Sequence, residues 1–312
     1  MKTLFRKRAA IDEMEIVTIG GSRQVLYSRG EDRKNPVILF IHGGPGSPMM
    51  PFLHRFQYSW EKEFTVVQWD QRLAGKTFFE NGPSGPMEAL NFERVVQDGL
   101  EVAQYLLKKF AVDRLIVLGH SWGTVLGAAL VQKYPHYFSA FISIGQLVNN
   151  QEAAAMGLEA ARRYAKEHGL KRDLSKLERI ENPWHVRPYL AKYKMAEDIS
   201  LRLIFFALTT PYYRFRDLRY LLDKQRFSYH QPLYDFLETF HIRQLGVDYR
   251  VPVFYLMGEN DYQTPYPLAR DFFEELTAPV KTFYTLRNTA HLPMFDANEE
   301  VLACLVQIKS QL

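Results

Sequence analysis

The stretch Leu115-Ile116-Val117-Leu118-Gly119-His120-Ser121-Trp122-Gly123 contains the strongest structural signal in the sequence. An apolar run leads into a serine flanked by glycines, and residues 124–134 can form a helix. This is the G-x-S-x-G pattern in a strand, turn and helix context, where the serine occupies a sharp, strained turn. Glycines two residues either side let the strand and the helix approach without Cβ clashes. A structural serine is the alternative, but this context predicts that Ser121 is a nucleophile.

Similar apolar runs recur along the chain and alternate with helix-like segments. Residues 37–41 and 115–118 are continuous apolar runs and 252–257 is nearly so, while 64–69, 140–144 and 282–286 add further predicted strands. The helix-like segments cover about 92–110, 122–134, 266–276 and 298–312. Runs without polar positions suit strands of a parallel sheet that is buried on both faces. Residues 13–30 add a hairpin around Gly20-Gly21-Ser22. The sequence therefore predicts an α/β fold with a mostly parallel, doubly wound sheet.

The alternation of strands and helices fails between residues 146 and 248. This stretch is helical in pattern, rich in aromatic residues and without a recurrent strand signal. The chain of 312 residues also exceeds what one hydrophobic core usually serves. We therefore predict a core whose first part is residues 1–145, an inserted helical cap at 146–248, and the second part of the core at 249–312.

The composition is that of a soluble globular chain, with 47% hydrophobic and 24% charged residues. A single cysteine, Cys304, cannot form an internal disulfide, and the first residues lack the apolar stretch of a secretory signal. We therefore expect a cytoplasmic protein without stable membrane insertion. The net charge of +4 is too balanced to indicate nucleic-acid binding. Residues 151–250 contain 18 Lys and Arg against 13 Asp and Glu, so the positive excess lies there.

A serine nucleophile needs a base that is held in the right tautomer by a carboxylate. Asp261 follows the predicted strand that ends at Met257, and His291 follows the one that ends near Leu286. Both lie just past carboxyl ends of strands, on the sheet edge that also carries Ser121. Glu259 is the nearest rival of Asp261, and His42, His120 and His241 are the rivals of His291. We predict a triad of Ser121, Asp261 and His291.

Acyl transfer also needs hydrogen-bond donors for the developing oxyanion. The backbone N–H of Trp122 is one candidate. The second is expected from the loop after the first parallel strand, His42-Gly43-Gly44-Pro45-Gly46, through Gly43 or Gly44. The alternative is a plain glycine-rich turn.

Five motifs together resemble the proline iminopeptidase-like branch of the α/β-hydrolases. They are HGGPG at 42–46, WDQR at 69–72, GHSWG at 119–123, GENDYQTP at 258–265 and AHLPMFD at 290–296. The resemblance covers about two thirds of the chain. It implies the same triad and a helical cap over the site. It also implies supporting roles for Asp70 and Arg72, and His42 and His120 adjoin the predicted site.

The chain departs from that family in the predicted cap. Proline iminopeptidases share a Trp-x-x-Trp-Glu pattern whose glutamate helps to hold the α-amine of the substrate, and here the only cap tryptophan, Trp184, is followed by His185. A buried ammonium without a counter-charge is costly, so an aminopeptidase needs a carboxylate there. Glu152, Glu181 and Glu238 are possible substitutes, although a glutamate in such a position is more often a solvated helix residue. Trp184 and other cap aromatics could line the substrate pocket or form the core of the cap.

The sequence thus predicts a serine hydrolase that forms an acyl-enzyme and needs no metal or organic cofactor. By resemblance, its substrate would be a short peptide or small molecule with an N-terminal prolyl or small aminoacyl amide. The missing cap motif leaves a carboxylesterase open. A non-catalytic ligand receptor on the same scaffold is a further alternative. The sequence does not indicate an oligomeric state.

Overall fold

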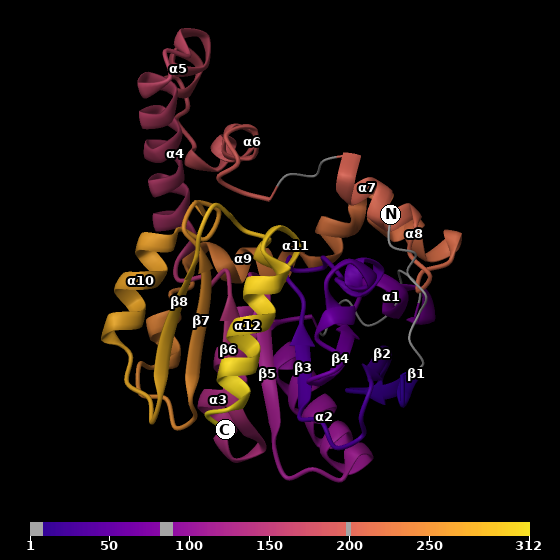
Figure 1. Cartoon of the computed structure of the whole chain (residues 1–312). Coiled ribbons are helices and arrows are strands. Elements are labelled where there is room, and N and C mark those ends of the chain that lie inside the picture. The colour runs from indigo at the N-terminus through magenta and orange to yellow at the C-terminus, as the bar shows by residue number, and fades with distance from the viewer. Residues whose placement is uncertain (1–8, 82–89, 198–200) are drawn as a thin grey trace.

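The computed structural model describes residues 9–81, 90–197 and 201–312, and within them eight strands form one mixed sheet. The strand order is β1-β2-β4-β3-β5-β6-β7-β8 (Figure 1). The strands are β1 (Ile11–Ile19), β2 (Ser22–Gly30), β3 (Val37–Ile41), β4 (Thr65–Asp70), β5 (Leu115–His120), β6 (Phe138–Ile144), β7 (Val253–Gly258) and β8 (Lys281–Leu286). β1 and β2 form the predicted antiparallel hairpin, and the strands from β4 to β8 in this order pair in parallel. The predicted doubly wound α/β fold is confirmed.

Helices cover both faces of the sheet. In chain order they are α1 (Gly75–Asn81), α2 (Phe92–Phe110), α3 (Trp122–Lys133), α4 (Asn150–Glu167), α5 (Lys171–Leu177), α6 (Arg187–Lys192), α7 (Leu201–Leu208), α8 (Phe215–Leu222), α9 (Gln231–Thr239), α10 (Tyr266–Glu275), α11 (Pro293–Asp296) and α12 (Asn298–Lys309). Short 3-10 helices are η1 (Met50–Arg55), η2 (Gln57–Ser59), η4 (Pro135–Tyr137), η5 (Pro183–Val186), η6 (Lys224–His230) and η7 (Ile242–Leu245).

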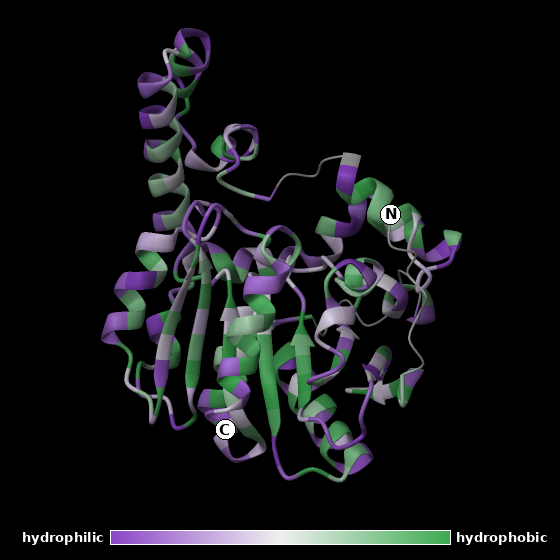
Figure 2. Ribbon diagram, viewed as in Figure 1, coloured by the Kyte–Doolittle hydropathy of each residue, from purple (hydrophilic) through white to green (hydrophobic). Residues whose placement is uncertain are grey.

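The central strands are mostly hydrophobic because each face of the sheet packs against helices, and β3 has no polar residue at all. On β5, Leu115 and Val117 join the cluster formed with α2, α3 and α10, while Ile116 and Leu118 join the one formed with η1 and α12. Successive side chains of a strand point to opposite faces, so a strand buried on both sides needs apolar residues at most of its positions. Figure 2 shows this concentration of hydrophobic residues on the inner strands.

A helical insert, defined here as α4 to η7, separates β6 from β7. In Figure 1, α4 and α5 project beyond the carboxyl ends of the strands, and α6 to α8 lie above the same edge. The insert occupies the stretch for which the sequence predicts a cap. The division at residues 145/146 and 248/249 remains a prediction. The predicted absence of a secretory signal concerns residues 1–16, of which residues 1–8 lie outside the described residues.

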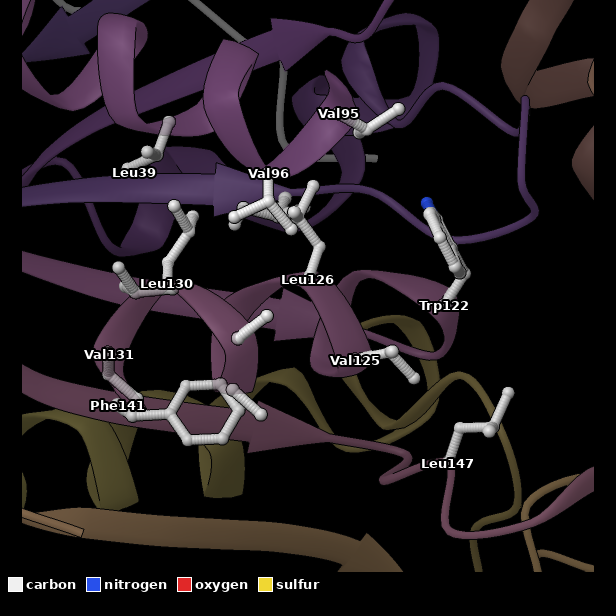
Figure 3. Close-up of a cluster of buried hydrophobic side chains, with 14 of the residues drawn as sticks. Leu39, Val95, Val96, Trp122, Val125, Leu126, Leu130, Val131, Phe141 and Leu147 are labelled. Carbon is white, nitrogen blue, oxygen red and sulfur yellow. The ribbon is translucent and has the colours of Figure 1, made fainter. Parts of the chain in front are cut away.

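The passage from β5 into α3 is packed without room for side chains at two glycines. A Cβ at Gly119 would collide with the carbonyl oxygen of Gly123, and one at Gly123 would collide with that of Ile41 on β3. Around this contact, α3 and α2 bury a dense apolar cluster that includes Val96, Trp122 and Leu126 (Figure 3). β5 and α3 can therefore approach only with glycine at both positions, as the G-x-S-x-G pattern predicts.

Gly123→Ala should lower the free energy of unfolding by about 3 kcal/mol or more, because its methyl group meets backbone atoms that cannot move alone. Gly169→Ala is the control: Gly169 has a φ of +67° but open space around it, so only backbone strain of about 1–2 kcal/mol is expected. Urea denaturation of both variants measures the difference. Equal destabilisation would contradict the close contact.

Candidate active site

Ser121 lies at the turn between β5 and α3, where its backbone has φ 54° and ψ −121°. A positive φ is rare for a residue with a side chain, so the turn must be held by its neighbours. The N–H of Ser121 donates to the carbonyl of Ile144 over 3.0 Å. Its own carbonyl accepts from the N–H of Thr124 over 2.8 Å and from the Thr124 hydroxyl over 2.6 Å. These bonds fix Ser121 at the carboxyl end of β5 with 8% of it exposed.

Asp261 and His291 form a buried hydrogen-bonded pair on the loops after β7 and β8. Asp261 Oδ2 accepts from His291 Nδ1 over 2.8 Å, and both side chains are fully buried. Asp261 also accepts from the N–H groups of Gln263 and Thr264 and from the Thr264 hydroxyl. Because the carboxylate can only accept from Nδ1, this bond selects the tautomer whose Nε2 carries a lone pair. His291 Nε2 has no hydrogen-bond partner among the described residues.

The imidazole of His291 packs against the residues that flank Ser121. His120 Nε2 lies 2.9 Å from the carbonyl oxygen of His291, and the two rings are 4.9 Å apart. A Cβ at Gly145, next to the residue that accepts from Ser121, would lie 3.1 Å from His291 Cε1. The loops after β5, β6 and β8 therefore meet at one edge of the sheet.

The rival residues make other contacts. Glu259 accepts from the N–H of Asn288, and His241 lies 3.5 Å from Glu152 on the insert. His42 is buried, and its desolvation lowers its pKa to about 3. A histidine with so low a pKa stays neutral at physiological pH and is a poor proton acceptor. Desolvation likewise lowers the pKa of His120 to about 3.

The glycine loop, residues 42–46 after β3, lies next to the turn at Ser121 between β5 and α3, which we call the elbow. A Cβ at Gly43 would lie 3.2 Å from Ser121 Cβ, so the loop passes directly beside the serine. Gly44 follows with φ 112°, and the N–H of Ser47 closes the loop by donating to the Gly43 carbonyl over 3.1 Å. Trp122 is the first residue of α3, so its N–H has no acceptor within the helix. The structure thus brings together the residues predicted to supply oxyanion donors.

Gln71 connects the glycine loop to the elbow. Its N–H donates to His42 Nε2 over 3.2 Å, its side-chain Nε2 donates to the His42 carbonyl over 3.0 Å, and its Oε1 accepts from Trp122 Nε1 over 3.1 Å. His42 Nδ1 completes the network with a 2.8 Å bond to the Gly43 carbonyl. The sequence predicts supporting roles for Asp70 and Arg72, the two neighbours of Gln71, but not for Gln71 itself. The signal available was its place in the WDQR motif.

The side chains of Asp70 and Arg72 bond to residues outside the predicted triad. Asp70 Oδ2 accepts from the hydroxyl of Tyr213 on the insert and from the N–H of Lys76. Arg72 pairs with Asp98 through two bonds of 2.8 and 2.9 Å, beneath the β1–β2 hairpin. Both side chains are buried and hydrogen-bonded, so they hold together the framework around the site.

A cavity of about 590 Å³ opens beside His291, between the core and the insert. It is lined by Lys194, Ala196, Glu197, Arg202, Leu203, Phe206, Asn288, Thr289, Ala290, His291, Leu292, Phe295 and Asp296. Asp296 forms an ion pair with Arg202 at 2.9 Å. Glu197 is thus a carboxylate of the insert that faces the same space as His291. Ser121 does not line the cavity, which reaches the site from the His291 side.

The substrate-binding residues suggested by sequence do not line this cavity. Glu152, Glu181 and Glu238 are exposed, and Glu152 lies beside His241. Trp184 is 36% exposed and lines a small hollow with Tyr262 and Gln263, next to Asp261 in the chain. Glu197 was missed because it stands alone, without a motif around it. No cluster of three or more His, Cys, Asp or Glu suited to a metal ion occurs in the described part of the chain.

Comparison with known proteins assigns the family. The sequence model of the family described as alpha/beta hydrolase fold matches residues 36–298 of this chain. The chain belongs to the α/β-hydrolase family. It is 30% identical over 300 residues to a probable aminopeptidase, YbaC, of Bacillus subtilis, covering 92% of this chain and 93% of that protein. It is 28% identical over 120 residues to a probable proline iminopeptidase of Leptolyngbya boryana, covering 38% and 34% of the two chains.

Among solved structures, the proline iminopeptidase-related protein TTHA1809 from Thermus thermophilus is similar in fold. The TM-score is 0.65 at 22% identity, with 94% of this chain and 95% of that chain covered. The resemblance of this α/β-hydrolase to the proline iminopeptidase-like branch is confirmed. None of the described helices has the length and hydrophobicity needed to cross a bilayer. The cytoplasmic location and the absence of nucleic-acid binding remain predictions.

Asp70 should make the stability of this hydrolase depend on pH. Desolvation raises its pKa from 3.8 to about 7, so the folded state retains a proton that the unfolded chain has lost in that range. Stability therefore falls as pH rises from about 4 to about 7. Relative to Asp70→Asn, the native free energy of unfolding should drop by roughly 2 kcal/mol between about pH 5 and about pH 8. Urea denaturation of both proteins at each pH measures this, and a difference that does not vary with pH would contradict it.

Proposed function

We propose that this α/β-hydrolase is a serine hydrolase that cleaves N-terminal prolyl or small aminoacyl amides through an acyl-enzyme. The observation that carries the proposal is the buried bond that His291 Nδ1 donates to Asp261 Oδ2, which leaves Nε2 as the free proton acceptor beside the Ser121 elbow. A strained serine next to such an imidazole is the arrangement that activates a hydroxyl for attack.

In the proposed mechanism, Ser121 Oγ attacks the substrate carbonyl while His291 Nε2 takes its proton. The structure gives His291 Nε2 no hydrogen bond to Ser121, and catalytic hydrogen bonds often tighten only when substrate binds. The N–H groups of Trp122 and of Gly43 or Gly44 stabilise the tetrahedral oxyanion. His291 then protonates the leaving amine, and water, deprotonated by the same imidazole, hydrolyses the acyl-enzyme. The Asp261 carboxylate orients His291 and stabilises the imidazolium.

Glu197 supports an aminoacyl substrate. Among the described residues of the insert, it is the carboxylate that lines the cavity with His291, and a free α-amine bound there would need such a counter-charge. The full-length similarity to a probable aminopeptidase favours the same class. Glu197 therefore replaces Glu152, Glu181 and Glu238 as the proposed partner of the amine.

Ser121→Ala should abolish labelling by a fluorophosphonate probe and nearly all turnover, with the fold preserved. The control is Ser139→Ala. Ser139 lies near the amino end of β6, away from the sheet edge that carries Ser121, and its hydroxyl donates to the Leu115 carbonyl, so this variant should label as the native chain does. A native chain that the probe does not label would favour the non-catalytic receptor. Labelling that persists in Ser121→Ala would refute the assigned nucleophile.

The amide and ester alternatives separate on two substrates, prolyl naphthylamide and p-nitrophenyl acetate. Clear cleavage of the prolyl amide is expected. Turnover of the ester alone would favour the carboxylesterase and contradict the aminopeptidase.

Glu197→Gln should lower kcat/KM for prolyl naphthylamide about tenfold or more, since a hydrogen bond to a charged group contributes about 1.5–3 kcal/mol. Turnover of p-nitrophenyl acetate, which has no ammonium, should change little. Glu238→Gln, on the exposed face of α9, is the matched control and should leave both rates unchanged. Equal losses on both substrates, or none on the amide, would count against an amine site at Glu197.

A further inference from the structure

Part of the helical insert forms hydrogen bonds to the glycine loop of the proposed oxyanion hole. The hydroxyl of Tyr220 on α8 donates to the Gly46 carbonyl over 2.9 Å, and that of Tyr234 on α9 donates to the Pro45 carbonyl over 2.9 Å. These bonds join residues 174 and 189 positions apart in the chain. Two consecutive carbonyls of the loop are therefore held by side chains that do not belong to the core.

The contact is tight as well as polar. Tyr220 is 1% exposed and His230, at the end of η6, is 2% exposed. A Cβ at Gly46 would lie 2.6 Å from the His230 ring and 3.0 Å from the Tyr220 hydroxyl. The insert thus closes on the backbone of the loop itself, and the loop has no room to shift toward it.

The same part of the insert also holds the neighbouring WDQR loop. His230 Nε2 lies 3.2 Å from the Arg72 carbonyl, and the Tyr213 hydroxyl donates to Asp70. Gln71, which lies between Asp70 and Arg72 in the chain, bonds to His42 and to Trp122. The two loops that the insert grips are therefore those that carry or contact both candidate oxyanion donors.

We propose that Tyr220 and Tyr234 are positioning residues that set the geometry of the oxyanion hole, so that catalysis depends on how the insert is seated. The inference rests on the proposed function. The loop closes through the bond from Ser47 N–H to the Gly43 carbonyl, so a shift at Pro45 or Gly46 is transmitted to the N–H groups of Gly43 and Gly44. Misplacement of a donor by a fraction of an ångström weakens it most in the transition state, where the oxyanion develops.

The test compares Tyr220→Phe, Tyr234→Phe and the double variant, which keep the rings and remove only the hydroxyls. We expect the rate of fluorophosphonate labelling and kcat for p-nitrophenyl acetate to fall together, by about tenfold or more in the double variant, with KM changed less than about threefold. The unfolding temperature should fall by only about 2–4 °C for each lost hydrogen bond. A merely structural role would lower the unfolding temperature and leave the labelling rate and kcat of the folded protein unchanged.

Tyr229→Phe is the matched control. Tyr229 lies on η6 between the two proposed residues, but its hydroxyl bonds to Asp223 and Gln225 within the insert. Its removal should leave labelling and kcat unchanged. If Tyr220→Phe does not fold, Tyr234→Phe, whose ring is only partly buried, decides alone. If the native chain is labelled and Tyr220→Phe, Tyr234→Phe and the double variant are labelled as fast as it is, this inference is overturned. If the native chain is not labelled at all, the proposed function is overturned.

Discussion

The close approach of β5 and α3 at Gly119 and Gly123 is the contact on which the rest of the site depends. It turns the chain within one residue, so Ser121 takes a positive φ that a side chain ordinarily avoids. That conformation persists because the bonds to Ile144 and Thr124 and the apolar packing of α3 hold both sides of the turn. The packing of the core therefore stabilises the strained backbone at Ser121, and the sheet fixes the position of the serine.

Buried polar groups then tie the loops of the sheet edge together. His42, which burial keeps neutral, donates through one nitrogen and accepts through the other, and Gln71 joins it to Trp122. Each bond lies in a region from which water is excluded, where an unpaired polar atom would cost about 1–3 kcal/mol. The loop geometry is thus specified by hydrogen-bond satisfaction, since glycine and proline side chains cannot specify it by packing.

The sequence predicted most of what depends on local pattern. Continuous or nearly continuous apolar runs identified β3, β5 and β7, because strands buried on both faces need apolar residues at most positions. The positions of Asp261 and His291 followed from a topological rule, that carboxyl ends of parallel strands share an edge, and the structure joins these two by a hydrogen bond. Their catalytic roles remain proposals.

What the sequence could not supply depends on distant pairs of residues. Glu197 gains its interest only from facing the same cavity as His291, and the hydroxyls of Tyr220 and Tyr234 only from reaching a loop more than 170 residues earlier. No periodicity or spacing encodes such contacts. Glu152, Glu181 and Glu238 were equally reasonable carboxylates by composition, and only the fold distinguishes them from Glu197.

The most direct test of the account is to trap the covalent intermediate. The native enzyme would be mixed with p-nitrophenyl acetate, quenched in acid during turnover and digested for mass spectrometry. The account predicts one added acetyl group, on the peptide that contains Ser121. An acetyl group on another residue, or turnover without any covalent adduct on a time scale that would capture it, would contradict the account.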